Sequence, residues 1–565
     1  GGSEDIGISK FNSTGSTLLY STYLGGNGSE VPHSLIVNDN NELYVLASTS
    51  SSNFPVTSNA FDTSFNGGSN FTLTNVIQYL TGSDIVITKF NVNGTQLLGS
   101  TYFGGSGNDG LSTDTRLRKN YADEVRGEIM IDEFSNVYIV SSTNSSNLPT
   151  TSGSFQPTYG GGNQDGCVAK FNYDLSNLIW ASYLGGDSSD AIYSMALDNN
   201  YNLMVCGGTY SRNLPTTFGC LQTAYAGGVS DGFIFKISTN GNQILQSTYI
   251  GKSTFDQAYL IKLDRQNDVY VMGLTDATGM LWIQNATWYN SGGGQFISKI
   301  SSDLSQIIWS TAFGSGRIGP DISPTALMVD LCKCIYISGW GSPKVNAHVG
   351  NTNCGTSGLP ISVDAFQTTT DNNDFYFISI DENASKLIFA TYFGGASSDE
   401  HVDGGTSRFD KKGCIYQAIC SSCGGRQDLP VTPGVVSQSN NSTNCNLGVV
   451  KIDFLSPSVV ADFACPSIIC APYTINFDNR SQVISSATST FFWDFGDGIT
   501  STLKNPAHTY TKSGIFKIKL IVADTGSCNF SDTLIKELLV LSNTKDTLPA
   551  KYMCKDDFIQ IGITP

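Results

Sequence analysis

The sequence predicts an all-β protein, a β-propeller followed by a small β-sandwich, on three observations. A six-residue phrase, Ser-Thr-Tyr-Leu-Gly-Gly or a close variant, recurs six times in 565 residues. Its third positions lie 63 to 81 residues apart, at Tyr23, Tyr102, Tyr183, Tyr249, Ala312 and Tyr392. Short apolar runs alternate with turns rich in glycine, and helical periodicity is nearly absent. Repeats of this length are typical of solenoids, propellers or arrays. Apolar runs that alternate with glycine-rich turns are typical of strands joined by turns.

Each repeat contains four motifs in a fixed order. The phrase predicts one strand, and a β-branched and aromatic run after it predicts another, at Glu42–Leu46, Asn136–Val140, Asn202–Cys206, Asp268–Met272, Cys334–Ser338 and Cys414–Ala418. In five units a loop bent by proline follows, at Phe54–Phe61, Leu148–Phe155, Leu214–Leu221, Leu359–Phe366 and Leu429–Val436. A closing strand ends the unit, at Asp5–Lys10, Asp84–Lys89, Asp165–Lys170 and Asp231–Lys236, with degenerate copies at Gly294–Lys299, Asp374–Ser379 and Asn446–Lys451. Four strands per unit, radially repeated, is the pattern of propeller blades.

Seven closing strands stand against six phrase strands, so the chain is expected to begin in the middle of a blade. Seven blades are favoured, with three strands of one blade preceding Gly1. In the alternative, the first strand pairs with the last of six blades as a closing clasp. The four motifs resemble the bacterial seven-bladed β-propeller repeat over residues 1–453.

A different pattern starts at Val459, where strands at short spacing predict a small β-sandwich. The run from Trp493 to Gly498 and the pair His508 and Tyr510 resemble the PKD-type immunoglobulin-like domain. The domain is predicted over residues 454–542, with Trp493 in its core and Gly496 and Gly498 in a hairpin turn. Residues 543–565 resemble the first strand of a further Ig-like module.

Fourteen cysteines, none of them in the first 166 residues, favour disulfides in an oxidising compartment over a metal site. Cys420 and Cys423 have the spacing of a zinc or redox motif, but no second pair or neighbouring histidine accompanies them. The PKD-type resemblance implies a Cys470–Cys528 bridge, and Cys445 could pair with Cys465 across the domain junction. The remaining disulfide candidates are Cys332, Cys354, Cys420 and Cys423.

A carboxylate recurs four residues after the last glycine position of the phrase, at Glu30, Asp109, Asp190, Asp256 and Asp399, and fails only in the Ala312 unit. The favoured role is structural, with the carboxylate capping turn amides or pairing with the repeat lysines. The alternative is calcium, which prefers oxygen ligands. No other cofactor is expected.

Aromatic residues and histidines give no catalytic site. Trp180 and Trp309 share the repeat position of Tyr20 and Phe389 and are expected in the core. Trp282, Trp288 and Trp340 lie in irregular inserts, where they could anchor loops or stack on a sugar. His401 is interpreted as a solvated loop residue, and no nucleophile, base or metal constellation is evident. The protein is therefore expected not to be an enzyme.

The net charge of −17 argues against a nucleic-acid partner, and no apolar run in these residues is long enough to span a bilayer. The resemblance implies a surface or secreted protein of gliding Bacteroidota, exported by type IX secretion and attached at the outer membrane. PKD-type modules act as spacers in such proteins. We expect an extracellular adhesin or gliding-motility structural protein whose partners are other surface or secretion-system proteins or surface glycans. The alternatives are a secreted protein that binds or degrades polysaccharide in the propeller channel, and a subunit of a surface filament.

Overall fold

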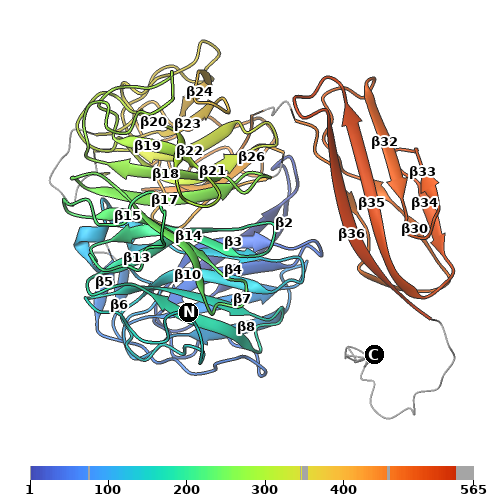
Figure 1. Ribbon diagram of the computed structural model, residues 1–565, viewed down its shortest axis with the longest axis horizontal. Coiled ribbons are helices and arrows are strands. Elements are labelled where there is room, and N and C mark those ends of the chain that lie inside the picture. The colour runs from blue at the N-terminus through green and yellow to red at the C-terminus, as the bar shows by residue number, and fades with distance from the viewer. Residues whose placement is uncertain are drawn as a thin grey trace. The chain divides into compact units, whose positions relative to one another are not determined.

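The computed structural model describes residues 2–73, 77–343, 345, 354–410, 412–454 and 458–542. The chain divides into two compact units, unit 1 (Gly1–Ser456) and unit 2 (Pro457–Pro565) (Figure 1). The described residues contain no α-helix, only two 3-10 helices, η1 (Thr115–Leu117) and η2 (Tyr121–Val125). No helix in this part of the chain has the length and hydropathy needed to cross a membrane. The all-β prediction is confirmed, and the expected module at residues 543–565 lies outside the described residues.

Five antiparallel sheets of unit 1 have four strands each, paired in chain order. They are β3 (Glu30–Val37), β4 (Leu43–Thr49), β7 (Asp84–Phe90) and β8 (Leu97–Phe103); β9 (Glu128–Ile131), β10 (Val137–Thr143), β11 (Asp165–Phe171) and β12 (Leu178–Leu184); β13 (Asp190–Leu197), β14 (Leu203–Thr209), β15 (Asp231–Ile237) and β16 (Ile244–Ile250); β17 (Asp256–Leu263), β18 (Val269–Thr275), β19 (Gln295–Ile300) and β20 (Ile307–Phe313); and β21 (Ile322–Val329), β22 (Ile335–Gly341), β23 (Phe375–Ile380) and β24 (Leu387–Phe393). The recurring phrase forms the fourth strand of each. The prediction that the Asp-to-Lys strand ends the unit is therefore wrong, because that strand is the third and pairs with the phrase strand that follows it.

Three smaller sheets complete unit 1. β1 (Ile6–Phe11) pairs with β2 (Leu18–Leu24); β25 (Arg408–Phe409), β26 (Cys414–Ser421) and β27 (Asn446–Asp453) form a three-stranded sheet; and β5 (Phe71–Leu73) pairs with β6 (Ile77–Tyr79). None of these sheets closes on itself. Because β1 pairs with β2 and β27 with β26, the alternative in which the first strand completes the last sheet is not the pairing that the structure has.

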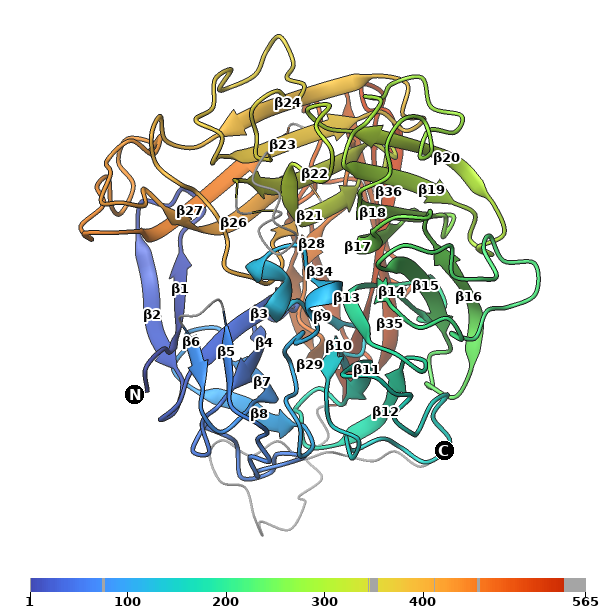
Figure 2. The ribbon, with the colours of Figure 1, turned by 90° about the vertical axis from the view of Figure 1, so that its left-hand side faces the viewer.

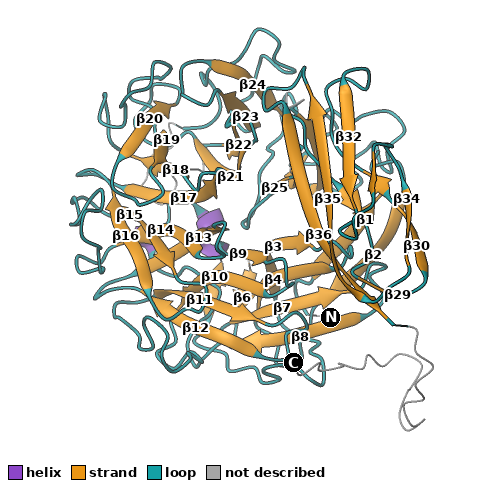
Figure 3. Cartoon of the chain, turned by 45° about the vertical axis from the view of Figure 1, so that its right-hand side comes forward, coloured by secondary structure: helices purple, strands orange, loops and turns teal. Residues whose placement is uncertain are grey.

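The sheets follow one another around a common centre, with the first strand of each nearest the middle (Figure 2). The two 3-10 helices lie toward this centre (Figure 3). β21 and β25 are neighbours there, and the Thr406 amide, just before β25, donates to the His33 carbonyl in β3 at 2.9 Å.

Backbone hydrogen bonds also link successive sheets near their outer edges. In each link, the loop between the second and third strands of one sheet donates to the next sheet's hairpin turn. The donor and acceptor pairs are Phe61 to Leu175, Phe155 to Gly241, Leu221 to Leu304, Trp288 to Ala384 and Val436 to Gly15, at 2.7 to 3.1 Å. The last link connects the loop between β26 and β27 to the turn between β1 and β2.

The tyrosine of the phrase fastens the proline loop of its own sheet. The Tyr102 hydroxyl donates to the Ser51 carbonyl at 2.7 Å and accepts from the Phe54 amide at 2.9 Å. Tyr183 makes the same two contacts with the second sheet's loop, and Tyr249 with that of the third. In the Ala312 unit, which lacks this hydroxyl, Trp282 stacks on Phe296 with ring centroids 3.6 Å apart. The irregular insert therefore supplies an aromatic anchor in place of the missing tyrosine.

Unit 2 is built from one five-stranded sheet and two strand pairs (Figure 1). The sheet contains β29 (Ile468–Cys470), β36 (Ser531–Leu541), β35 (Gly514–Asp524), β32 (Ser489–Asp494) and β33 (Thr500–Ser501); the pairs are β28 (Phe463–Ala464) with β31 (Asp478–Asn479), and β30 (Tyr473–Asn476) with β34 (Ala507–Tyr510). Trp493 is fully buried, with Phe463 and Phe477 at centroid distances of 5.0 and 5.1 Å. Gly496 and Gly498, both at positive φ, form the turn between β32 and β33, as predicted.

Candidate metal centre

The recurring carboxylates cap the glycine turns that connect successive sheets. One oxygen of each accepts the amide of the second residue of the Gly-Gly position, at 3.1 Å for Glu30, 2.7 Å for Asp109 and Asp190, and 2.8 Å for Asp256. The other contacts come from hydroxyls, as from Ser211 to Asp190 at 2.7 Å. The repeat lysines do not pair with these carboxylates. Lys89, Lys170, Lys236 and Lys299 instead form ion pairs with Glu42, Asp132, Asp198 and Asp264, in the turns between first and second strands.

Two of the six positions differ from the prediction. In the Ala312 unit, Asp321 accepts the Ser315 amide at 2.7 Å, so the carboxylate is present after all. In the last unit, Glu400 and not Asp399 accepts the Gly395 amide, at 2.8 Å. The turns in these two units are longer by two residues and by one residue, and a search at fixed spacing therefore misses Asp321 and selects the neighbour of Glu400.

A second acidic residue, at the start of or just before a third strand, faces most of these caps across a glycine. A Cβ atom on Gly104 would lie 2.6 Å from Asp84 Oδ1 and 2.9 Å from Asp109 Oδ2. The same arrangement surrounds Gly25, Gly185 and Gly394. The acidic residues face each other in the pairs Asp5 and Glu30, Asp84 and Asp109, Asp165 and Asp190, and Asp374 and Glu400. Glycine is required because the two carboxyl groups fill the space that a side chain would need.

Burial raises the pKa of both acids in two of these pairs. It raises the pKa of Asp84 and of Asp165 to about 8, that of Asp109 to about 6 and that of Asp190 to about 7. In Asp84 and Asp165, the charge of the facing carboxylate adds to the rise. Desolvation and like-charge repulsion both favour the protonated form, so each of these two pairs holds a proton near neutral pH. Calcium binding at these positions stays a prediction.

Two of the three tryptophans predicted to lie in inserts are buried and cannot stack on a sugar, and the placement of Trp340 in an insert is wrong, because it lies in β22. Trp282 and Trp340 are buried, and Trp288 is partly buried against the core of unit 1. Trp180 and Trp309 are buried as predicted, and their indole N–H groups donate to the carbonyls of Thr239 and Glu382.

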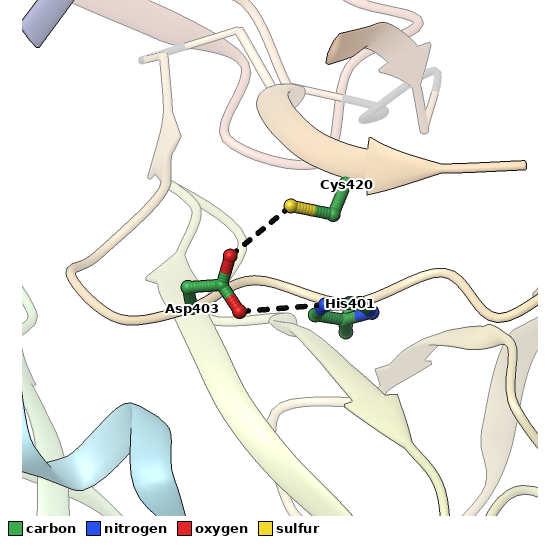
Figure 4. A group of neighbouring side chains, drawn as sticks. All are labelled: His401, Asp403 and Cys420. Atoms are coloured by element: carbon green, nitrogen blue, oxygen red, sulfur yellow. Dashed lines mark hydrogen bonds and ion pairs between the residues drawn. The ribbon is translucent and has the colours of Figure 1, made fainter. Parts of the chain in front are cut away.

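One group of three metal-ligating side chains meets among the described residues: His401, Asp403 and Cys420, whose ligand atoms all lie within 4.8 Å of one another (Figure 4). His401 Nε2 is 3.4 Å from Asp403 Oδ1, and the Cys420 thiol donates to Asp403 Oδ2 at 3.2 Å. Burial, followed by the charge of Asp403, raises the pKa of the Cys420 thiol to about 12. The thiol is therefore protonated in the structure described, which agrees with its donating a hydrogen bond.

Backbone pairing fixes two of these three residues. His401 and Cys420 form an antiparallel bridge, in which the His401 amide donates to the Cys420 carbonyl at 3.1 Å and the Cys420 amide returns a bond of 2.9 Å. Residues bridged in this way carry their side chains on one face. Asp403, two residues further along the loop, reaches back to both of them (Figure 4).

Aromatic rings from two other elements enclose His401. Tyr121 of η2 meets its ring edge-on at a centroid distance of 6.1 Å, and Trp340 of β22 lies at 6.0 Å. The Asn120 side chain and Asp123 cap η2 as a capping box. Asp403 is 58% exposed and His401 15%, so the group is open to solvent on the Asp403 side. The prediction that His401 is a solvated loop residue is wrong, because the histidine is paired and enclosed by rings.

The disulfides differ from the pairings expected. Cys423 bonds with Cys445, since Ser421 pairs with Asn446 in the ladder of β26 and β27 and brings the next residues together. The Cys445–Cys465 bridge is therefore wrong. The Cys470–Cys528 bridge is also wrong, because Cys470 is a free thiol and Cys528 bonds elsewhere. Cys470 pairs with Leu541 at the far end of β36 from Cys528, roughly 33 Å away at about 3.3 Å per residue.

The other cysteine candidates are Cys332, Cys354 and Cys420. Cys332 is in a disulfide. The Cys354 thiol donates to the Ser342 carbonyl at 3.2 Å. Cys420 is not bonded to Cys423, despite the two-residue spacing.

Comparison with known proteins identifies part of unit 2. The family model of the PKD domain matches residues 457–536, and these residues form a PKD domain. A pre-pro-metalloprotease, PrtV of Vibrio cholerae, is 26% identical over 158 residues, which are 28% of this chain and 17% of that protein. Collagenase ColQ1 of Bacillus cereus is 54% identical over 47 residues, 8% of this chain and 4% of the relative. The chain thus spans less than a fifth of either relative.

Solved structures give similarities of the same limited kind. The PKD1 domain of the Vibrio cholerae metalloprotease PrtV covers 15% of this chain and 98% of its own, at 27% identity and a TM-score of 0.13. An endo-arabinase from Bacteroides thetaiotaomicron covers 60% of this chain and 95% of its own, at 12% identity and a TM-score of 0.28. Neither score supports a functional argument. The PKD domain, the Cys423–Cys445 disulfide and the similarity to a pre-pro-metalloprotease indicate an extracellular protein.

Proposed function

We propose that unit 1 is a seven-bladed β-propeller, in which β1 and β2 are the outer strands of one blade and β25 to β27 belong to its neighbour. The support is the succession of sheets around one centre (Figure 2) and the backbone links between sheets. The link from Val436 to Gly15 repeats the geometry of the four links between complete sheets. The same link is expected between any two neighbouring blades, so its presence here supports one blade that contains β1 and β2 and a neighbouring blade that contains β26 and β27.

The protein would be a non-enzymatic extracellular adhesin or structural protein, associated with surface attachment or gliding motility. Its propeller would be a rigid interaction platform, and its PKD domain a spacer. The observation that carries this proposal is that the side chains recurring in every repeat make contacts within unit 1 that stabilise its fold. The tyrosines fasten loops, the carboxylates cap turns, and the lysines are ion-paired. Attachment at the outer membrane, export by type IX secretion, and surface proteins or glycans as partners are parts of the same proposal.

The buried acids near the centre also favour a non-catalytic unit 1. Asp123 pairs with Arg126 at 2.7 Å, and Glu128 lies 3.4 Å from both Lys262 and Arg408. A glycosidase needs one carboxyl group free to donate a proton and another free to act as base or nucleophile. Carboxylates held by cationic partners and hydrogen bonds are poor candidates for either role.

The test is a glycan array together with a panel of soluble polysaccharides, applied to the purified chain. We expect binding of a surface component without release of new reducing ends. Turnover of any polymer that is abolished in Asp123→Asn or Glu128→Gln would overturn the adhesin proposal in favour of the polysaccharide-degrading alternative. Sedimentation of the native protein as a polymer would instead support the filament subunit.

A further inference from the structure

We propose that His401, Asp403 and Cys420 bind a zinc ion. The group supplies one nitrogen, one oxygen and one sulfur ligand, a donor set that suits Zn²⁺. This site goes beyond the adhesin proposal, which requires no metal. It joins the loop before β25 to the end of β26, two segments held beside each other by the bridge between His401 and Cys420.

Each carboxylate oxygen of Asp403 lies near a tetrahedral ligand separation from one of its two neighbours. Ligand atoms about 2.1 Å from a central ion, in tetrahedral arrangement, lie about 3.4 Å apart. Asp403 meets its two neighbours with different oxygens: Oδ1 is 3.4 Å from His401 Nε2, and Oδ2 is 3.2 Å from Cys420 Sγ. One Asp403 oxygen, the His401 nitrogen and the Cys420 sulfur all lie within 4.8 Å of one another, and side-chain rotation would bring these three atoms to tetrahedral separations. The two bridged residues need no backbone movement because their main chains are already paired.

Ligand binding would change the hydrogen bonding of the group in a defined way. The Cys420 thiol now donates to Asp403, and on coordination its proton leaves to solvent and the thiolate binds the metal. The exposed side of Asp403 provides the entry path, and a fourth position remains for water or an anion.

The neighbouring rings limit the freedom of the histidine. Tyr121 and Trp340 contact each other at a centroid distance of 5.6 Å and both face His401. A ligand whose orientation is fixed before the metal arrives loses less conformational entropy on binding. This enclosure distinguishes His401 from an exposed histidine that meets an acid by chance.

The test uses Co²⁺ as a spectroscopic substitute for Zn²⁺ on the purified chain, with the Cys423–Cys445 disulfide kept oxidised. We expect a thiolate-to-cobalt charge-transfer band and visible bands of tetrahedral intensity, both removed by excess Zn²⁺. Cys420→Ser should abolish the charge-transfer band, and His401→Ala should weaken binding at least about tenfold. Cys470→Ser is the matched control, because Cys470 is an exposed free thiol in unit 2, and it should leave the spectrum unchanged.

A second measurement keeps the test decisive if either variant fails to fold. The unaltered chain is alkylated with and without Zn²⁺, and the labelled cysteines are mapped by mass spectrometry. Zn²⁺ should protect Cys420 at least about tenfold, as a bound thiolate is no longer a free nucleophile, while Cys470 labels equally in both samples. Octahedral Co²⁺ spectra without a thiolate band, or equal labelling of Cys420 with and without Zn²⁺, would overturn the proposal.

Discussion

At the scale of single residues, the tyrosine of the recurring phrase holds the proline loop through its hydroxyl group, and removal of that hydroxyl tests this role. Tyr102→Phe removes an acceptor from the buried Phe54 amide and a donor from the Ser51 carbonyl. An unsatisfied buried amide costs about 1 to 3 kcal/mol, so we expect the free energy of unfolding of unit 1 to fall by this amount. Differential scanning calorimetry measures the change. Tyr23→Phe is the control, since Tyr23 holds the same repeat position but is 81% exposed, and an equal loss there would contradict the assigned role.

The acid pairs predict an unusual dependence of stability on pH. The pKa of Asp165 is about 8 in the folded state against 3.8 for the ordinary side chain. The folded state therefore binds a proton that the unfolded chain has released, and this contribution to stability is lost as pH rises from about 4 to about 8. Asp165→Asn keeps a neutral side chain. We expect it to gain stability relative to the original chain between pH 5 and pH 8, by at least about 1 kcal/mol.

Thermal unfolding at several pH values measures this difference directly. Asp364→Asn serves as control, because Asp364 is exposed in the loop between β22 and β23, and its effect should not vary between pH 5 and pH 8. If the difference in stability between Asp165→Asn and the original chain were constant from pH 5 to pH 8, Asp165 would not be protonated in this range, which would contradict the assignment.

At the scale of elements, the glycine turns join successive sheets and leave no room for a side chain. In Gly104→Ala the new methyl group would meet Asp84 and Asp109 at 2.6 and 2.9 Å, and overpacking of this kind costs about 1 to 3 kcal/mol. We expect a lower melting temperature for unit 1. Gly7→Ala is the control, because a Cβ atom there meets nothing within 4 Å. A melting temperature for Gly104→Ala that equals that of Gly7→Ala would show that the turn can relax.

Sequence patterns were sufficient for the strands because alternation and turn residues act locally. The second strands, the phrase strands and most third strands occur where the repeat placed them. The repeat predicts the carboxylate caps wherever the turn length is constant, but not Asp321 or Glu400, where the turn is longer by two residues and by one residue. The group of His401, Asp403 and Cys420 was not found, because its bridge joins residues 19 apart outside regular strand pairing. The spacing of Cys420 and Cys423 suggests a pair that the structure does not have, because Cys423 bonds with Cys445.

At the scale of the whole molecule, the two compact units should unfold as separate transitions. Trp493 is the centre of the core of unit 2, and its removal to alanine costs about 3 to 5 kcal/mol. We expect calorimetry of Trp493→Ala to show one transition at a lower temperature and the transition of unit 1 unchanged. Phe530→Ala, at a position 66% exposed, should alter neither. A shift of both transitions in Trp493→Ala would show that the units unfold together.

The bond from the Val436 amide to the Gly15 carbonyl has a mechanical consequence. It holds the loop between the last two strands of unit 1 to the first hairpin of the chain, residues more than 400 positions apart. Tension that pulls the sheet of β25 to β27 outward must break this contact, together with that of Lys451 Nζ with the Ser13 carbonyl at 3.3 Å, before that sheet can peel away. A force applied near the end of unit 1 is therefore transmitted in part to its first hairpin. The contacts of the last sheet with that hairpin resist separation of the sheet under force.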